Sequence, residues 1–247
     1  MYKLLIIACF FALVDGLHAQ ELKTVSYTDG TQKLNGLLAA EGAQNKPGVL
    51  ILPAWKGIDK EAKDAALALE KEGYIAFIAD IYGEGNIPQD NAAAGKIAGK
   101  YKSDYKAYQH RIHLALEELK KAGAHTDKIA VIGYCFGGTG ALEAARGGLP
   151  VQGVVSIHGG LAKDSARPNT PLSTKILIEN PAEDKGVTPQ ILDALTKELN
   201  DGDADWQLIT YAHAGHTFTD PASPDYNKLM ADRAWQHTLL FLAELLK

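Results

Sequence analysis

The sequence predicts an α/β fold in which a mostly parallel central sheet carries helices on both faces. Short apolar runs of strand length recur along the chain, and segments with helical spacing of apolar residues separate most of them. Near the N-terminus, two strand-like segments flank a tight turn instead. Alternating strands and helices favour a parallel sheet, and such sheets bind ligands at the carboxyl ends of their strands.

The individual elements follow from local signals. Asp29 and Gly30 provide the turn of the hairpin, Asp59 can cap a helix that Gly73 closes, and Pro189 suits the first turn of a later helix. The expected order is a hairpin over 24–27 and 33–38, strand 49–52, helix 60–72, strand 74–79, loop 81–90, a helix from Ser103 or Asp104, strand 129–133, helix 139–146, strands 153–157 and 175–178, a helix from Thr188, strand 206–211 and a closing helix over 225–246. The closing helix is expected to bury one face, made of Tyr226, Leu229, Met230, Ala234, His237 and Phe241.

Residues 1–19 have the pattern of a signal peptide. Lys3 gives a short positive region, residues 4–14 are apolar, and Ala19 offers a small residue for cleavage. Export is therefore expected, with residues 20–247 forming a single domain, although a retained N-terminal anchor is the alternative. Cleavage near Ala19 removes Cys9 and leaves Cys135 as the only cysteine, so no intramolecular disulfide is possible.

The charge pattern limits the partners. The formal net charge is -5, and no basic cluster interrupts the chain. Nucleic acid and anionic membrane surfaces are therefore not expected partners, and no membrane span is expected after processing. A small-molecule substrate remains, and nothing in the sequence determines the oligomeric state.

Cys135 lies in the motif Gly133-Tyr-Cys135-Phe-Gly137-Gly138, between an apolar strand and a segment of helix-forming composition. This is the context of the nucleophile elbow G-x-S-x-G, with cysteine in place of serine. Small residues on both sides of the nucleophile permit the sharp turn, and the following helix directs its N-terminus at the sulfur, which favours thiolate. A buried structural cysteine in a glycine-rich turn is the alternative.

Asp184 and His216 are the candidate partners of Cys135. Each lies in a loop that leaves a different strand, and the order nucleophile, acid, histidine is typical of α/β-hydrolases. His216 would activate Cys135 and Asp184 would orient the imidazole, giving a covalent acyl-enzyme. Glu183 is the rival acid, and His213 and His158 are rival histidines, so the sequence leaves these assignments open.

Backbone N–H groups are expected to form the oxyanion hole. Phe136 follows the nucleophile, and Trp55 lies in the loop after an earlier strand, which are the two positions that the elbow architecture uses. Aromatic side chains near the strand ends could line the substrate pocket: Trp55, Tyr82, Tyr134, Phe136 and Phe218.

The combination of motifs resembles the dienelactone hydrolase family. The motifs are the cysteine elbow, Ala79-Asp-Ile-Tyr82-Gly, the Glu183-Asp184 pair before a helix, and Gly215-His216-Thr-Phe218. The resemblance implies an α/β-hydrolase fold, a triad of Cys135, His216 and Asp184, and hydrolysis of lactones or small esters. It implies neither a cofactor nor a metal.

Three positions depart from the pattern of that family's dienelactone-cleaving members. Ala54 stands where they carry a glutamate, and Glu84 and Asp220 stand where they carry arginines. The resemblance places Glu84 in the substrate pocket. Guanidinium groups recognise substrate carboxylates, so their replacement by acids predicts a neutral substrate.

Two other kinds of function compete with the hydrolase hypothesis. A non-catalytic or redox-responsive binding protein could retain this fold and its single cysteine. Metal binding through Cys135, His213 and His216 is a weaker alternative, because two histidines three residues apart in a loop are a poor metal signature.

Overall fold

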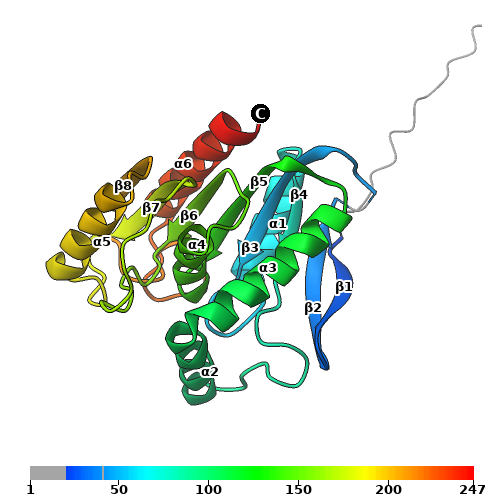
Figure 1. Cartoon of the computed structure of the whole chain (residues 1–247), viewed down its shortest axis with the longest axis horizontal. Helices are drawn as coiled ribbons and strands as arrows, with labels where there is room; N and C mark the ends of the chain where they lie inside the picture. Colours follow the sequence, from blue (N-terminus) through cyan, green and yellow to red (C-terminus); the bar gives the residue numbers. More distant parts are fainter. Residues whose placement is uncertain (1–20, 41) are drawn as a thin grey trace, which may run out of the picture.

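The computed structural model describes residues 21–40 and 42–247, and its strands form one eight-stranded sheet (Figure 1). The strand order is β1-β2-β4-β3-β5-β6-β7-β8, with β2 antiparallel to both of its neighbours and every other pair parallel. The strands are β1 (Lys23–Asp29), β2 (Gln32–Ala39), β3 (Lys46–Leu52), β4 (Ile75–Ile78), β5 (Ala124–Tyr134), β6 (Gly153–Ile157), β7 (Lys175–Pro181) and β8 (Trp206–Tyr211). The predicted α/β-hydrolase fold with an N-terminal hairpin is confirmed.

Helices cover both faces of this sheet and bury two separate cores. They are α1 (Lys60–Lys71), α2 (Asn91–Ser103), α3 (Tyr105–Lys121), α4 (Phe136–Arg146), α5 (Pro189–Asp201) and α6 (Lys228–Leu246). Helices α2 to α5 pack on one face against strand residues such as Leu50 and Val131. Helices α1 and α6 pack on the other face against their neighbours in sequence, such as Ile51 and Ile132. This alternation is the period of two expected of strands buried on both faces.

Side chains that accept hydrogen bonds from the first turn set the start of several helices. Asp59 accepts from the N–H of Ala62 at 2.9 Å, and Asp104 accepts from the N–H of Ala107 at 3.0 Å. Both residues are at the expected N-caps, where a carboxylate also interacts favourably with the helix dipole.

Helix α2 was not expected from the sequence. Asp90 caps it, and its buried residues are Ala94, Ala98 and Tyr101. The small alanines and glycines of this segment give little hydrophobic periodicity, so the pattern that indicates an amphipathic helix is weak here. Its position matters for the site described below.

Helix α6 corrects the predicted closing helix. It begins at Lys228 after the cap residue Asn227, and Tyr226 and Leu229 are exposed. Its buried residues are Ala234, Thr238, Leu242 and Leu246. On this face Leu242 and Leu246 pack in the core, and the Thr238 hydroxyl donates a hydrogen bond to the buried Glu179 carboxyl at 3.1 Å.

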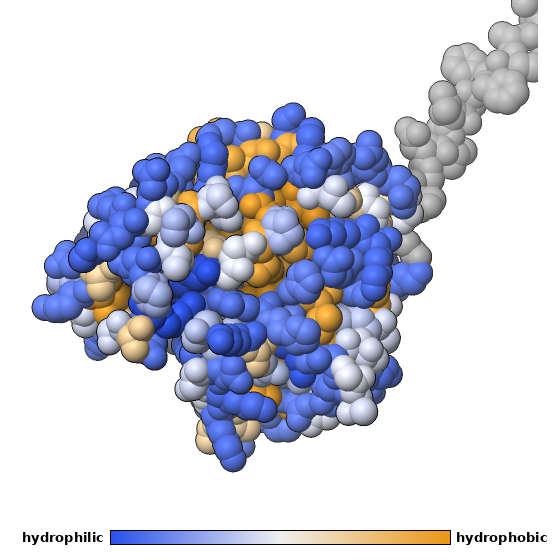
Figure 2. All heavy atoms as spheres, viewed as in Figure 1, coloured by the Kyte–Doolittle hydropathy of each residue, from blue (hydrophilic) through white to orange (hydrophobic). Residues whose placement is uncertain are grey.

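Hydrophilic residues cover most of the face shown in Figure 2, with a smaller apolar area between them. Within residues 21–40 and 42–247, none of the helices combines the length and apolar character needed to cross a membrane. The predicted signal peptide lies outside the described residues.

Candidate active site

Cys135 lies on a sharp turn between β5 and α4. Its φ of +52° is in the left-handed region, which is strained for a residue with a side chain. The turn depends on the glycines two residues on either side. A Cβ on Gly133 would collide with the backbone of Gly137, and a Cβ on Gly137 would collide with the carbonyl of Leu52. The motif is therefore required sterically, and it presents the sulfur at the carboxyl edge of the sheet.

The structure brings Cys135, His216 and Asp184 into one continuous contact. His216 Nε2 lies 3.1 Å from Cys135 Sγ, and His216 Nδ1 lies 2.6 Å from Asp184 Oδ2. The other Asp184 oxygen accepts a hydrogen bond from the N–H of Gly186 at 2.8 Å. The loop after β7 supplies the acid and the loop after β8 supplies the histidine, so parallel strands deliver all three side chains to one edge.

Electrostatics within this contact favour a protonated histidine. The hydrogen bond to Asp184, followed by that to Cys135, raises the pKa of His216 to about 10, against an opposing effect of burial. Burial acts to raise the pKa of Asp184, but hydrogen bonds from His216 and Gly186 outweigh it and hold the pKa below its ordinary value. At neutral pH the Nε2–H of His216 can therefore donate to the sulfur.

Glu183 and His213 form a separate pair at the surface. Glu183 Oε1 lies 3.4 Å from His213 Nδ1, and both side chains are exposed. The structure thus places Asp184, and not Glu183, against His216. Among the described residues, no group of three or more histidine, cysteine or acidic side chains could hold a metal ion.

The two predicted oxyanion residues flank Cys135 and are held by tyrosine hydroxyls. Phe136 is the first residue of α4, where backbone N–H groups lack intrahelical acceptors. The hydroxyl of Tyr108 donates to the Phe136 carbonyl at 2.9 Å, and the hydroxyl of Tyr82 donates to the Trp55 carbonyl at 2.9 Å. These bonds hold the loop after β3 and the start of α4, which both border the sulfur.

A cavity of about 450 Å³ opens beside Cys135. Its walls come from the loop after β3, from α2, from the elbow and from the loop after β8. The lining residues are Trp55, Gly95, Ala98, Gly99, Lys102, Cys135, Phe136, His216 and Thr217. Trp55 and Phe136, expected here as aromatic residues, do line it.

The other predicted pocket residues lie elsewhere. Tyr82 is buried in an aromatic stack against Phe136, with ring centroids 5.6 Å apart. Tyr134 is buried on the opposite face of the sheet, and Phe218 packs against Tyr211. Glu84 is exposed and forms an ion pair with Lys33 at 3.2 Å, beside the hairpin. An aromatic near a strand end is thus often core, because its side chain follows the alternation of the strand.

The acids expected to repel anionic substrates are not in the cavity. Glu84 lies at the hairpin, and Asp220 caps a turn by accepting from the N–H of Ala222 at 2.8 Å. The cavity instead contains a cation, Lys102, which the sequence analysis missed together with α2. The Asp90 cap was the available signal for this helix.

His158 is a further residue that the sequence left ambiguous. It is buried behind the elbow, with its ring 5.5 Å from that of His216. Its Nδ1 accepts a hydrogen bond from the N–H of Cys135 at 3.1 Å, so Nε2 carries the proton and donates to Thr219 at 2.8 Å. Burial, reinforced by His216, lowers the pKa of His158 to about 3, which keeps the ring neutral. His158 therefore supports the elbow backbone.

Comparison with known proteins identifies relatives along nearly the whole chain. The dienelactone hydrolase family profile matches residues 34–246. A probable 2-oxo-3-(5-oxofuran-2-ylidene)propanoate lactonase from a Bradyrhizobium species is 30% identical over 227 residues, covering 87% of this chain and 90% of the relative. A putative carboxymethylenebutenolidase from Saccharolobus solfataricus is 24% identical over 263 residues, covering 91% and 99%.

Solved structures of related proteins have the same fold. The crystal structure of a dienelactone hydrolase-like promiscuous phosphotriesterase from metagenomic libraries superposes with a TM-score of 0.86 at 29% identity, covering 93% of this chain and 100% of the other. A putative dienelactone hydrolase from Klebsiella pneumoniae superposes with a TM-score of 0.72 at 18% identity, covering 91% and 99%, and so shows the fold alone.

Proposed function

The chain belongs to the dienelactone hydrolase family, and we propose that it is an exported hydrolase of small carboxylic esters or lactones with Cys135 as nucleophile. Family membership gives the reaction class, hydrolysis of a lactone or ester, and a small-molecule substrate. The names of the lactonase and carboxymethylenebutenolidase relatives support that class. The cysteine mechanism is carried by one observation, the continuous contact of Asp184, His216 and Cys135 beside the cavity.

In the proposed acylation step, the Cys135 thiolate attacks the ester carbonyl carbon and the carbonyl π electrons move to oxygen. The backbone N–H groups of Phe136 and Trp55 donate to this oxyanion. When the tetrahedral intermediate collapses, the C–O bond to the leaving group breaks and His216 Nε2–H gives its proton to the departing alkoxide. A thioester on Cys135 and a free alcohol result, or a tethered alcohol when the substrate is a lactone.

Deacylation reverses the roles. Neutral His216 takes a proton from water, and the hydroxide attacks the thioester carbonyl. Collapse of this second intermediate breaks the C–S bond, releases the carboxylic acid and restores the pair of thiolate and imidazolium. Asp184 holds the Nδ1–H of His216 throughout and so keeps Nε2 directed at the reacting atoms.

Turnover of 4-nitrophenyl acetate tests the nucleophile. The wild type should hydrolyse this ester, and Cys135→Ala should lower kcat by at least about a thousandfold, since removal of a nucleophile leaves only residual catalysis. Intact-mass measurement of acid-quenched wild type should show one added acetyl group, absent from Cys135→Ala. Full activity in Cys135→Ala would contradict the mechanism, and absence of turnover by the wild type would favour the non-catalytic alternative.

The proposed export rests on the sequence of residues 1–19. Expression of the full chain in a bacterium, followed by fractionation and N-terminal sequencing, tests it. Export predicts a periplasmic or secreted product that starts near Gln20, whereas an intact N-terminus in the membrane fraction would indicate the retained anchor.

A further inference from the structure

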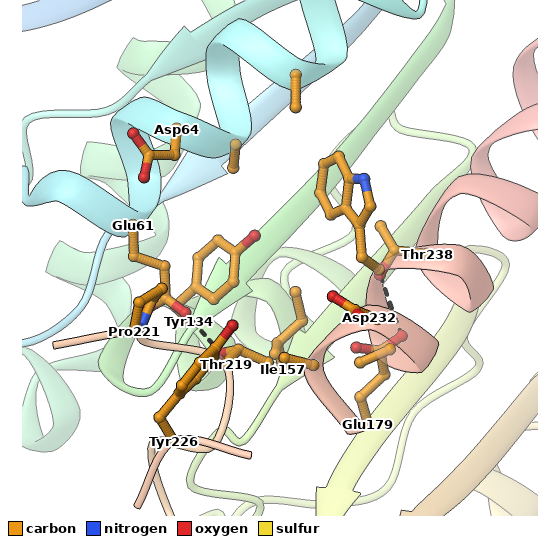
Figure 3. Close-up of a pocket in the computed structure, with 15 residues that line it drawn as sticks. Glu61, Asp64, Tyr134, Ile157, Glu179, Thr219, Pro221, Tyr226, Asp232 and Thr238 are labelled. Carbon is orange, nitrogen blue, oxygen red and sulfur yellow. Dashed lines mark hydrogen bonds between the residues drawn. The ribbon is translucent and has the colours of Figure 1, made fainter. Parts of the chain in front are cut away.

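A second cavity lies on the opposite face of the sheet, between α1 and α6 (Figure 3). Its volume is about 320 Å³, at the lower end of the range of about 300–1,000 Å³ for small-molecule sites. Tyr134, Ile157 and Glu179 line it from the ends of β5, β6 and β7. None of the residues that line the Cys135 cavity borders this one. We call it the α1/α6 cavity.

Carboxyl groups dominate the polar lining of the α1/α6 cavity. Four acids border it, Glu61, Asp64, Glu179 and Asp232, and no lysine, arginine or histidine of the described chain does. Asp64 and Asp232 are neutralised by Lys60 at 2.5 Å and by Lys228 at 2.7 Å. Glu61 and Glu179 have no such cation.

Glu179 has an unused hydrogen-bonding atom. Its side chain is fully buried, and Oε1 accepts from the Thr238 hydroxyl at 3.1 Å. Oε2 has no partner that meets hydrogen-bond geometry within residues 21–40 and 42–247, although a weaker interaction with the Tyr211 hydroxyl also reaches this carboxyl. A buried carboxyl oxygen without a well-placed donor is costly and rare in folded proteins, so this atom can accept a hydrogen bond from a ligand in the cavity.

Burial favours the protonated form of Glu179 and of Glu61. Burial raises the pKa of Glu179 well above its ordinary value and that of Glu61 to about 8. The Glu61 carboxyl is anchored by the Thr219 hydroxyl, which donates to it at 2.5 Å. A cation that entered here would displace a proton and form the charge-assisted hydrogen bonds that these groups lack.

The walls are apolar and aromatic. Trp235 comes from α6, Tyr226 from the loop before it, and Ala65 and Ala68 from α1. The ring of Tyr134 lies beside Glu61 (Figure 3). Aromatic faces attract organic cations through the ring quadrupole while they also bury apolar surface. Aromatic walls around carboxyls without a cationic partner thus favour an organic cation over a neutral or anionic ligand.

We propose that the α1/α6 cavity is a binding site for a small organic ammonium with an apolar body of about one ring, its ammonium group held by Glu179 on the α6 side of the cavity. The carboxylate that ester hydrolysis releases would find no cationic partner among the described residues that line this cavity, so the site does not suit that product. The proposal does not depend on the proposed hydrolase function, and its test measures binding.

Three probes of nearly equal size separate the contribution of the positive charge from that of the aromatic ring. Calorimetric titration of the wild type with benzylammonium chloride should show one site per chain, with benzyl alcohol at least about tenfold weaker and benzoate without binding, since only the first carries a cation that can pair with a carboxylate of the cavity. Absence of benzylammonium binding, or equal affinity for the alcohol, would overturn the proposal.

Variants locate the site. Glu179→Gln keeps the acceptor for Thr238 but not the negative charge, and should weaken benzylammonium binding about tenfold or more. Ala68→Phe fills the cavity without changing charge and should abolish binding. Glu72→Gln, at the exposed end of α1, is the matched control and should bind as the wild type does, and so should Cys135→Ala, which alters only the other cavity.

Thermal unfolding without probe establishes whether each variant is folded. If either Glu179→Gln or Ala68→Phe fails to fold, the other still tests the location of the site. Undiminished binding in a folded Glu179→Gln or Ala68→Phe variant would overturn the location. Loss of binding in Cys135→Ala would place the probe in the catalytic cavity and would likewise overturn the proposal.

Discussion

Two cavities open near the carboxyl edge of the sheet, on its opposite faces, and the pKa values of their acidic groups are shifted in opposite directions. Beside Cys135, Asp184 contacts His216 and its pKa is lowered. In the α1/α6 cavity, Glu61 and Glu179 have no cationic partner among the residues that the structure describes, and their pKa values are raised. Burial acts in the same direction on all three carboxyls, so the partner decides which of them is ionised at neutral pH.

The comparison shows why a position at a strand end does not identify a catalytic acid. Residues 134 and 135 are adjacent, yet Tyr134 faces one cavity and Cys135 the other. A partly buried chain of hydrogen bonds connects the two sides, from the Cys135 N–H through His158 and Thr219 to Glu61. Substitution of the groups that make the two cavities differ tests this contrast.

The largest effect is expected from loss of the acid that has a partner. Asp184→Asn should lower kcat/KM for a chromogenic ester by about a hundred- to ten-thousandfold. The substitution replaces the negative carboxylate that holds His216 Nδ1–H by a neutral amide, so the imidazole is no longer held in the same tautomer and charge state. Glu183→Gln, one residue away and paired with His213 at the surface, should stay within about twofold of wild type. The reverse pattern would make Glu183 the triad acid.

The pH profile of acylation should reflect the raised pKa of His216. Because that pKa is about 10, the imidazolium persists through neutral pH, and kcat/KM should fall only as the pH approaches 10 and the proton is lost. Asp184 is the main cause of this shift, so in Asp184→Asn the decline of kcat/KM should occur at a pH that is lower by about one pH unit or more. Rates are measured with Cys135→Ala as the blank. A decline at an unchanged pH in Asp184→Asn would contradict the stated cause.

A moderate effect on stability is expected from Glu61 in the other cavity. Its pKa rises from 4.5 to about 8 on folding, so the folded state holds a proton that the unfolded chain has lost. Stability from this group is complete below pH 4.5 and declines as the pH rises toward 8. Glu61→Gln removes the decline, so its gain in Tm over wild type should be larger at pH 8 than at pH 5.

Thermal scans at the two pH values test this expectation, and Glu72→Gln at the exposed end of the same helix should show no such difference. A gain that is equal at both pH values would mean that Glu61 is ionised in the folded protein.

The smallest effect is expected from Lys102, the cation of the catalytic cavity. Lys102→Met should lower kcat/KM for the mono-4-nitrophenyl ester of succinate relative to 4-nitrophenyl butyrate by up to about fivefold, since an exposed cation contributes about 1 kcal/mol or less. Lys56→Met removes a cation near Trp55 that does not line the cavity, and should leave the ratio unchanged. An unchanged ratio in Lys102→Met would mean that this cation does not act on the substrate carboxylate. A wild-type preference for the neutral ester would support the neutral substrate that the sequence predicted.

The sequence alone was sufficient for the features that local chemistry controls. The elbow needs small residues at 133 and 137 for steric reasons within one turn, and the caps at Asp59 and Asp104 act over three residues. The alternation of apolar strands and helices determined the parallel sheet, and the order of Cys135, Asp184 and His216 suggested the triad.

Only the tertiary structure decided which of these residues meet. Asp184 and His216 are 32 residues apart, and a shift of one position in the loop would have offered Glu183 instead. The strand positions of Tyr134 and Glu179 send their side chains to the α1/α6 face, and α2, whose alanines and glycines give no strong pattern, brings Lys102 beside Cys135. Contacts between distant segments depend on strand order and side-chain direction, which are set when the sheet assembles, and no local pattern in the sequence records them.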